Sequence, residues 1–383
     1  MSTNPFGMPG NPPTNPAPAP AAAPTSAPQP QPQTIVIQQP RSRWSSWWAR
    51  LGWMGFLFCA IWLISLTAQT EQYFDTTGGI TEKFHSGSTK ATTTDKIAII
   101  TISGAIMDGE GFARKQMEKI RKDEHVKGVV LRVDSPGGSV SASDYIYHHL
   151  KQLRAEKIKK LNENNAGEQK DFPLIVSMGS MAASGGYYVA MAVGDQKQSI
   201  YAEPTTTTGS IGVLIPQYDI SGLLEKYDIK DDTIATHPRK TMLSMTKEMT
   251  VEERELVRNY INESFTRFKD IIKDGRPHFK KDESALNELA TGEIFTAAQA
   301  KKTGLIDEIG FIEDAIDRAI ALAKLDKESV RVVQFESPTS LLGIDLAQSR
   351  NSNATALEAL MELSTPKAYY MCTSLPPLMR SGK

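Results

Sequence analysis

The pattern of apolar and polar positions divides the chain into three parts. Residues 51–68 form an uncharged, almost wholly apolar run, and the stretch before it is rich in Pro, Ala and Gln. From residue 95 onward, short β-branched apolar runs alternate with longer segments of mixed polarity. The short runs predict buried strands, whereas longer segments with apolar residues every three or four positions predict amphipathic helices.

The elements predicted after residue 95 alternate between strand and helix. Strands are predicted at 96–106, 126–134, 173–179 and 329–336, and helices at 111–122, 139–161, 182–193, 221–227, 250–273 and twice within 293–324. Thr250 and Glu253 have the spacing of a capping box at the start of one long helix. Because strands that alternate with helices favour parallel βαβ units, the sequence predicts an α/β fold.

The apolar run at 51–68 predicts a membrane-spanning helix. At ~1.5 Å per residue it covers most of a hydrocarbon core. Basic residues and tryptophans gather on its N-terminal side: Arg41, Arg43, Trp44, Trp47, Trp48 and Arg50. The positive-inside rule then places residues 1–50 in the cytoplasm and the remaining chain across the membrane. A cleaved signal peptide fits less well, because the run begins far from Met1.

Five regions are expected from these patterns. Residues 1–50 form a Pro/Ala-rich tail whose composition buries too little apolar surface for a fold, so the tail is expected to be disordered. The other regions are an anchor at 51–69, a stalk at 70–94, one α/β domain at 95–336 and a C-terminal tail at 337–383. Within that tail the apolar stretch 364–380 is expected either to dock onto a neighbouring subunit or a substrate groove, or to be a loosely packed terminus.

Composition narrows the classes of partner. The formal net charge of −1 does not favour nucleic-acid binding, because nucleic-acid binders are usually strongly basic. The two cysteines, Cys59 and Cys372, are far apart in sequence and show no zinc-ligand spacing. The sequence therefore predicts no metal site and no cofactor.

Three glycine-bearing turns each follow an apolar run: "DSPGGSV" at 134–140, "GSMAASGGYY" at 179–188 and "TTGSIGV" at 207–213. Glycines let backbone N–H groups approach an incoming group closely. A phosphate cradle is the weaker interpretation, because no GxGxxG or G-K-[ST] motif is present. An oxyanion hole fits better, and tight turns without chemistry are the simpler alternative.

Ser184 is the candidate nucleophile, because it precedes Gly185 at the start of a predicted helix, where the helix dipole favours negative charge. A serine nucleophile needs a base. His237 is the one tempting histidine downstream, and Lys240 is the alternative, since Ser–Lys dyads use an amine. Free lysine has a pKa of ~10.4, so the site must desolvate Lys240 or place a hydroxyl beside it. A solvated surface lysine is the competing interpretation.

Five stretches, in order along the chain, resemble the signal peptide peptidase A (protease IV) family of membrane-anchored serine–lysine peptidases, in its short single-repeat form. They are "VVLRVDSPGGSV", "SMGSMAASGGYYVAMA", "TTTTGSIGVL", "RKTMLSMTKEMTVEER" and "GEIFTAAQAKKTGLIDEIG". The resemblance covers roughly residues 95–325 and implies a peptidase domain of crotonase/Clp-protease-like repeated ββα units. It also implies homo-oligomeric rings whose active sites combine residues from adjacent subunits, and peptide substrates left from cleaved signal peptides.

The resemblance assigns roles to individual residues. It implies that Ser184 is the nucleophile, that Lys240 is its general base and that Ser210 orients the lysine amine. The oxyanion donors that it implies are the amides of Gly137, Gly138 and Gly185. The stretch "LSMTK" departs from the family, which usually has a proline after that serine and an arginine at position 247.

Three alternatives remain open at this point. Lys247 competes with Lys240 as the base. A crotonase-like acyl-CoA enzyme would use the paired amides without a covalent serine, and a catalytically inactive membrane scaffold would use the fold alone. The leading expectation is a single-pass protein of the inner (cytoplasmic) membrane that contacts lipid through residues 51–69 and carries an extracytoplasmic serine peptidase.

Overall fold

The computed structural model describes residues 43–163, 171–337 and 368–372. The chain divides into two compact units, Met1–Ala68 and Gln69–Lys383. The expected disordered tail lies outside the described residues up to position 42, as does most of the expected C-terminal tail.

The first unit is described as one helix, α1 (Arg43–Phe74), whose last turns belong to the second unit. The window Arg50–Thr67 is long and apolar enough to cross a membrane. Its large apolar side chains are exposed, with Trp53, Ile61 and Ile64 each about two-thirds accessible. A core helix of a soluble protein would bury these side chains, so the helix is compatible with the predicted anchor.

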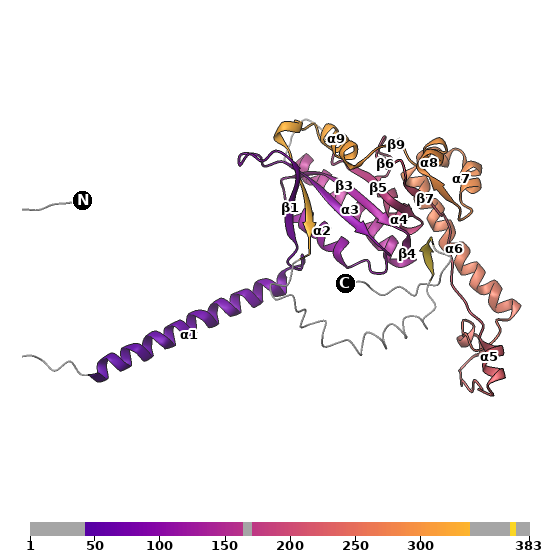
Figure 1. Ribbon diagram of the computed structural model, residues 1–383, viewed down its shortest axis with the longest axis horizontal. Helices are drawn as coiled ribbons and strands as arrows, with labels where there is room; N and C mark the ends of the chain where they lie inside the picture. The colour runs from indigo at the N-terminus through magenta and orange to yellow at the C-terminus, as the bar shows by residue number, and fades with distance from the viewer. Residues whose placement is uncertain (1–42, 164–170, 338–367, 373–383) are drawn as a thin grey trace, which may run out of the picture. The chain divides into compact units, whose positions relative to one another are not determined.

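The second unit is built around a mostly parallel sheet (Figure 1). The sheet strands are β1 (Thr81–Gly87), β2 (Lys96–Ser103), β3 (Val126–Ser135), β5 (Leu174–Ala183), β6 (Ile200–Ala202), β7 (Thr207–Gly209), β8 (Ile294–Thr296), β9 (Glu308–Ile309) and β10 (Arg331–Glu336). Their order is β1-β10-β2-β3-β5-β6-β9, with β7 paired to both β5 and β8. A separate antiparallel pair joins β4 (Gly137–Ser139) to β11 (Tyr369–Met371).

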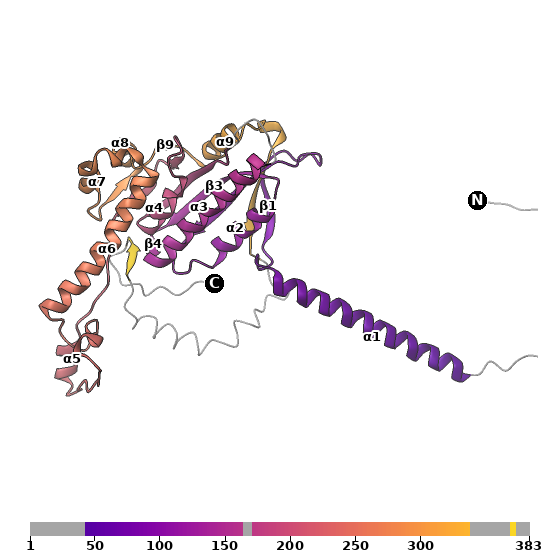
Figure 2. The same ribbon diagram turned by 180° about the vertical axis from the view of Figure 1, so that it is seen from behind.

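Helices cover both faces of the sheet (Figure 2). The helices of this unit are α2 (Phe112–Lys122), α3 (Val140–Glu163), α4 (Gly185–Ala190), α6 (Val251–Gly275), α7 (Glu283–Leu289), α8 (Ala297–Lys302) and α9 (Ile312–Leu322), with 3₁₀ turns η1 (Met191–Val193), η3 (Pro277–Lys280) and η4 (Lys327–Ser329). The short helix α5 (Ser221–Lys226) and the 3₁₀ turn η2 (Pro238–Thr241) bury no residue and do not cover the sheet. Alternate residues of β2 enter different cores. Ile97 and Ile99 pack in the cluster that contains α9, whereas Ala98 and Ile100 pack in the cluster that contains α2 and α3. Burial on both faces explains why this strand is a continuous apolar run rather than an alternating one.

The α/β class predicted from the sequence is confirmed, as is the capping box formed by Thr250 and Glu253. The predicted strands and helices are present, but the short strands β4, β6, β7, β8 and β9 and the helix α7 were not predicted. The expected stalk differs, because residues 81–87 form β1, which pairs antiparallel with β10. Its sequence "TEKFHSG" is mostly exposed at the sheet edge, so it has no hydrophobic pattern that marks a strand. The described residues 368–372 of the expected tail also belong to a strand pair.

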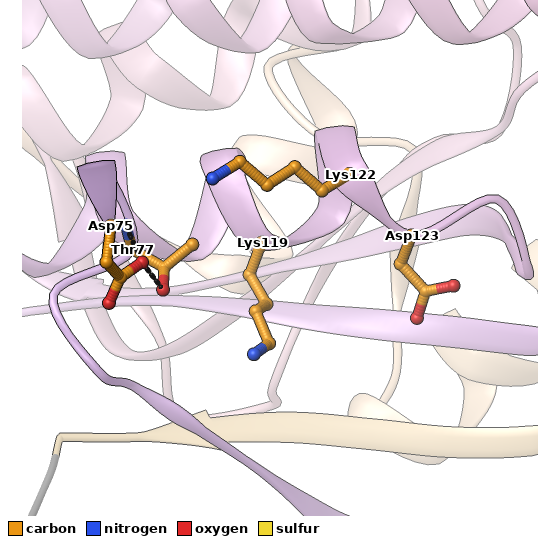
Figure 3. A pocket seen from close by; sticks show the side chains of 5 residues that line it. All are labelled: Asp75, Thr77, Lys119, Lys122 and Asp123. Atoms are coloured by element: carbon orange, nitrogen blue, oxygen red, sulfur yellow. Dashed lines mark hydrogen bonds between the residues drawn. The ribbon is translucent and has the colours of Figure 1, made fainter. Parts of the chain in front are cut away.

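The turn that leads into β1 is organised by the carboxylate of Asp75 (Figure 3). It accepts hydrogen bonds from the Thr77 hydroxyl (2.5 Å) and from the amides of Thr77 and Gly79 (both 2.8 Å). These bonds lower the pKa of Asp75 to about 2. Lys119 and Lys122 of α2 line a surface pocket of about 320 Å³ with this turn, so the ionised carboxylate faces a basic helix surface.

Lys157 on α3 is a buried cation. Its side chain is 5% exposed, and its Nζ donates a hydrogen bond to the Asp123 carbonyl oxygen at 2.5 Å. Burial lowers the pKa of Lys157 from 10.5 to about 8. Between these two values the unfolded chain binds more protons than the folded one, so the free energy of unfolding rises with pH across that window.

We expect the Lys157→Met variant to be more stable than the wild type by about 1–2 kcal/mol at pH 7, because it removes a charge that is costly to bury. The variant should also lose most of the rise in stability between about pH 8 and pH 10. Urea denaturation at several pH values measures both effects. Lys159→Met, at an exposed position of the same helix, is the matched control. An unchanged pH slope in Lys157→Met would contradict the assignment.

Candidate active site

Ser184 sits at the sharp turn between β5 and α4, in a strained backbone conformation. Its φ of 53° and ψ of −113° place a non-glycine residue in a region that costs roughly 1–3 kcal/mol. Its N–H donates to the Gly209 carbonyl on β7, and its own carbonyl accepts the Tyr188 N–H, both at 2.8 Å. A strand–turn–helix junction of this kind presents a side chain as the nucleophile elbow of hydrolases does.

The side chain of Ser184 is buried without a hydrogen-bonding partner. The residue is 1% exposed, and its Oγ makes no hydrogen bond within the described part of the chain. Leaving a buried hydroxyl unpaired costs about 1–3 kcal/mol, so this arrangement is not accounted for by stability.

Two glycine turns meet beside Ser184. A Cβ atom added to Gly137 would lie 2.6 Å from the Gly185 nitrogen, and one added to Gly185 would lie 3.1 Å from the Gly138 nitrogen. Gly137 also has a φ of 98°, which favours glycine. Side chains are excluded from this contact, so the amides of Gly138 and Gly185 come from different elements to the same small space.

The β4 turn is held in place by the loop before α2. Ile106 donates its N–H to the Gly137 carbonyl at 2.9 Å and accepts the Ser139 N–H at 2.8 Å. The N–H of Gly137 is itself donated to the Ser135 hydroxyl at 3.1 Å. Of the two predicted donors in this turn, Gly137 is therefore already engaged.

Ser210 lies close to Ser184 because of strand pairing. Ala183 and Gly209 are register partners on the parallel strands β5 and β7, and the two serines are the residues that follow them. Ser210 also has a positive φ, 50°, and its N–H donates to the Glu293 carbonyl at 2.6 Å. The structure thus brings Ser184, Ser210 and the three predicted glycines to one edge of the sheet.

Lys240 is not part of this cluster within a single chain. It lies in η2, is exposed, and makes no ion pair or side-chain hydrogen bond within the described part of the chain. Residues 212–252, which we name the arm, contain no buried residue. The arm includes α5, which lies beyond the projecting end of α6, away from the sheet (Figures 1 and 2).

The two competing bases have structural partners. The Nδ1 of His237 accepts the Arg239 N–H at 3.1 Å and so caps η2. Lys247 forms an ion pair with Glu253 at 2.8 Å, and Glu253 completes the capping box of α6. The hydrogen bond from Lys247 lowers the pKa of Glu253. Among the described residues, no group of three or more His, Cys, Asp or Glu side chains could hold a metal ion.

Comparison with known proteins identifies the family. Residues 166–326 match the family described as Peptidase family S49. An Enterococcus faecium protein named as a signal peptide peptidase SppA is 34% identical over 299 residues, which cover 72% of this chain and 80% of the relative. The chain belongs to the S49 peptidase family.

Two further S49 relatives are longer than this chain. Protease 4 of Salmonella typhi is 36% identical over 67% of this chain and 39% of its own length. The chloroplastic serine protease SPPA of Arabidopsis thaliana is 32% identical over 65% of this chain and 36% of its own length. The family resemblance predicted from the sequence is confirmed, and the protein is a serine peptidase.

One neighbour of this site was not predicted in its actual position. Strand β11, at residues 369–371, pairs with β4 and so lies against the diglycine turn. The sequence signal was the apolar, aromatic stretch 364–380, for which docking into a groove was one of several expectations. Local pattern does not identify which groove such a segment enters.

We expect Gly185→Ala to reduce S49 peptidase activity by about 100-fold, the typical effect of losing one oxyanion donor. The added methyl group would meet the Ser143 Oγ at 2.6 Å and push the diglycine turn away. Hydrolysis of a fluorogenic peptide measures the loss, and a thermal unfolding curve checks the fold. Gly111→Ala is the control, because its nearest new contact is the movable Asp108 carboxylate. Full activity in Gly185→Ala would exclude a tight amide cluster at this position.

Proposed function

We propose that this S49 peptidase is a membrane-anchored endopeptidase that uses a serine–lysine dyad. The observation that carries the proposal is Ser184, a buried hydroxyl without a partner, on a strained elbow beside two converging glycine turns. Strain and an unpaired polar atom are both costly, and proteins retain such features at sites of chemistry.

The chemistry follows from these positions. Neutral Lys240 takes the proton of the Ser184 hydroxyl as its Oγ attacks the scissile carbonyl carbon of a peptide. The amides of Gly138 and Gly185 stabilise the oxyanion. Lys240 then protonates the leaving amine, and water repeats the sequence to release the acyl group from Ser184. Ser210, next to Ser184, is the hydroxyl that orients the lysine amine.

Gly138 is a better oxyanion donor than Gly137 in this proposal. The N–H of Gly137 is donated to the Ser135 hydroxyl, so it serves to hold the turn. Gly137 has a positive φ, and this backbone conformation sets the direction in which the chain continues to Gly138.

A second copy of this chain supplies Lys240. In one chain, Lys240 is an exposed residue of the arm, whose helix α5 lies away from the sheet (Figure 1). The arm also exposes large apolar side chains: Leu223 (55%), Tyr227 (66%) and Ile234 (95%). Exposed apolar side chains on an element with no buried residue favour an interface, and a neighbouring copy that packs there would complete the dyad. We therefore propose a homo-oligomeric ring with sites between subunits.

The two other bases fit this chemistry less well. The Nζ of Lys247 is bound to Glu253 at 2.8 Å, so Lys247 would have to leave this ion pair to reach the serine. His237 already uses its Nδ1 to cap η2. Lys240 has no such commitment among the described residues, which supports it as the base.

Membrane anchoring and substrate class complete the proposal. Helix α1 would hold the enzyme in the cytoplasmic membrane, with the basic N-terminal side in the cytoplasm and the peptidase unit outside it. Peptides left in the membrane after signal-peptide cleavage are the proposed substrates, in line with the name of the Enterococcus relative. The parallel sheet flanked by helices supports a crotonase/Clp-like arrangement, which we propose as the finer fold class.

Ser184→Ala and Lys240→Ala should each lower peptide hydrolysis by at least about 1,000-fold, because each removes a dyad member. If sites form between subunits, co-assembly of the two inactive variants restores activity to about a quarter of wild type, since one site in four pairs an intact serine with an intact lysine. Mixing after dissociation and reassembly, followed by a peptidase assay, measures this recovery.

Lys247→Ala is the matched control for the lysine assignment. It should weaken the start of α6 but leave the peptidase chemistry in place. Full activity in Lys240→Ala would refute its role as the base. Two inactive single variants with no recovery on mixing would instead place both dyad residues in one chain.

Removal of residues 1–68 should release the peptidase unit from membranes. The deleted part contains the helix segment Arg50–Thr67, whose burial in lipid is worth many kcal/mol, whereas the unit after it has its own core. Alkaline carbonate extraction of cell membranes followed by immunoblotting compares the two forms. Retention of the shortened chain in the carbonate-resistant pellet would count against α1 as the anchor.

A further inference from the structure

Three lysines lie along the solvent-facing side of α2. Lys115, Lys119 and Lys122 are spaced at i, i+4 and i+7, so they share one side of the helix. Met117 and Ile120, on the other side, are completely buried in the core. We name Lys115, Lys119 and Lys122 the lysine stripe.

The lysine stripe carries charge that the chain does not pair. None of its three members forms an ion pair or a side-chain hydrogen bond with another described residue. The nearby carboxylates are bound to other cations: Glu118 pairs with Arg114 at 2.7 Å, and Asp123 pairs with Lys96 at 2.9 Å. A helix surface that meets only water commonly carries opposite charges at i, i+4, and the stripe has no such pair.

The lysine stripe adjoins the turn that follows α1. A Cβ atom added to Gly78 would lie 2.9 Å from the Lys115 Nζ. The other two lysines line one surface pocket with Asp75, Thr77 and Asp123 (Figure 3). The Asp75 carboxylate accepts the three hydrogen bonds of its own turn and supplies one negative charge against three positive ones. The excess charge beside this turn is therefore positive, which suits an anionic ligand.

The chain between the apolar span and this turn is short. The span ends at Thr67, and ten residues later Thr77 is buried, followed by Ile80 in the core. Ten residues cover about 15 Å as a helix and at most about 35 Å as extended chain. The turn, with the lysine stripe beside it, therefore stays within reach of the headgroups of any membrane that α1 crosses.

We propose that the lysine stripe binds the phosphate groups of anionic phospholipids in the leaflet where α1 ends. The inference rests on the proposed function, because it takes α1 as the membrane anchor. Lysine is a compact point charge that binds phosphate without a fixed geometry, and each lysine near an anionic surface strengthens the attraction. The short tether gives the headgroups a high effective concentration at the stripe. The contact holds the α2 side of the peptidase unit on the membrane.

This contact is electrostatic and does not replace the anchor. Salt screens the attraction, and in alkaline carbonate lysine loses its charge above its usual pKa of ~10.4. Carbonate extraction of the chain without residues 1–68 therefore reports on α1 alone, whereas the lysine stripe must be tested near neutral pH.

Lysine acetylation of the full chain in lipid nanodiscs tests the proposal. A water-soluble acetylating reagent followed by mass spectrometry measures the rate at each lysine, in discs of phosphatidylcholine with and without phosphatidylglycerol. Phosphatidylglycerol at about one third of the lipid should slow acetylation of the lysine stripe by about threefold or more, and about 0.5 M NaCl should restore it. Lys302, exposed on α8 near the opposite end of the sheet, is the internal control and should react equally in both discs.

Lys119→Gln combined with Lys122→Gln should abolish the protection of Lys115 in anionic discs and leave hydrolysis of a soluble fluorogenic peptide unchanged. Lys281→Gln combined with Lys302→Gln is the matched control, since it removes the same charge from exposed positions and should keep the protection. The first pair lies in the last turn of α2, where lysines also stabilise the helix, so a thermal unfolding curve checks the fold. The wild-type comparison does not depend on the stability of either variant.

Three outcomes would overturn the inference. Equal acetylation of the lysine stripe in both kinds of disc would reject lipid binding and leave the anchor standing. Equal protection by inorganic phosphate in phosphatidylcholine discs would assign the stripe to soluble anions instead of lipid. A full chain that does not enter the discs would reject the anchor and this inference together, so the two failures are distinguishable.

Discussion

The left-handed backbone of Ser184 is the constraint on which the site depends. Two hydrogen bonds, to the Gly209 carbonyl and from the Tyr188 N–H, hold the residue in this conformation, and both anchors are parts of the core. Helix α4 is buried at every position, so the elbow cannot relax by moving the helix. Gly186 lets the helix approach the Ser135 carbonyl, where an added Cβ would lie only 2.8 Å away.

A network of buried polar groups that includes Tyr187 of α4 stabilises the turn at Ser184. The hydroxyl of Tyr187 donates to the Leu305 carbonyl at 2.7 Å, and the same carbonyl accepts a hydrogen bond from Arg276. Arg276 also pairs with Asp307 at 3.0 Å, and Asp307 accepts backbone N–H bonds from Ser199 and Ile200 at the start of β6. This network links α4, the end of α6 and β6 through Arg276 and Asp307, although the buried Nη2 of Arg276 has no hydrogen-bonding partner among the described residues.

The core around Ser184 and the exposed arm differ in burial and packing. The core places Ser184, Ser210 and the glycines with strand register and close packing, whereas the arm exposes its apolar side chains and leaves Lys240 unpaired among the described residues. On the proposed assembly, peptidase activity depends on a neighbouring chain, so an isolated subunit would hold a nucleophile without its base. The segment at Ala368–Cys372 covers the amide cluster within the chain itself.

Sequence alone determined the parts of this protein that depend on local pattern. Neighbouring residues were enough to predict four features: the apolar runs of β2 and β3, the capping box at Thr250, the apolar helix around Arg50–Thr67 and the ordered motifs of the S49 family. The polar strand β1 could not, because pairing with β10, far along the chain, makes it a strand. The same holds for β11 on β4. These features are set by contacts between segments distant in sequence, whose energies appear only once the chain has packed.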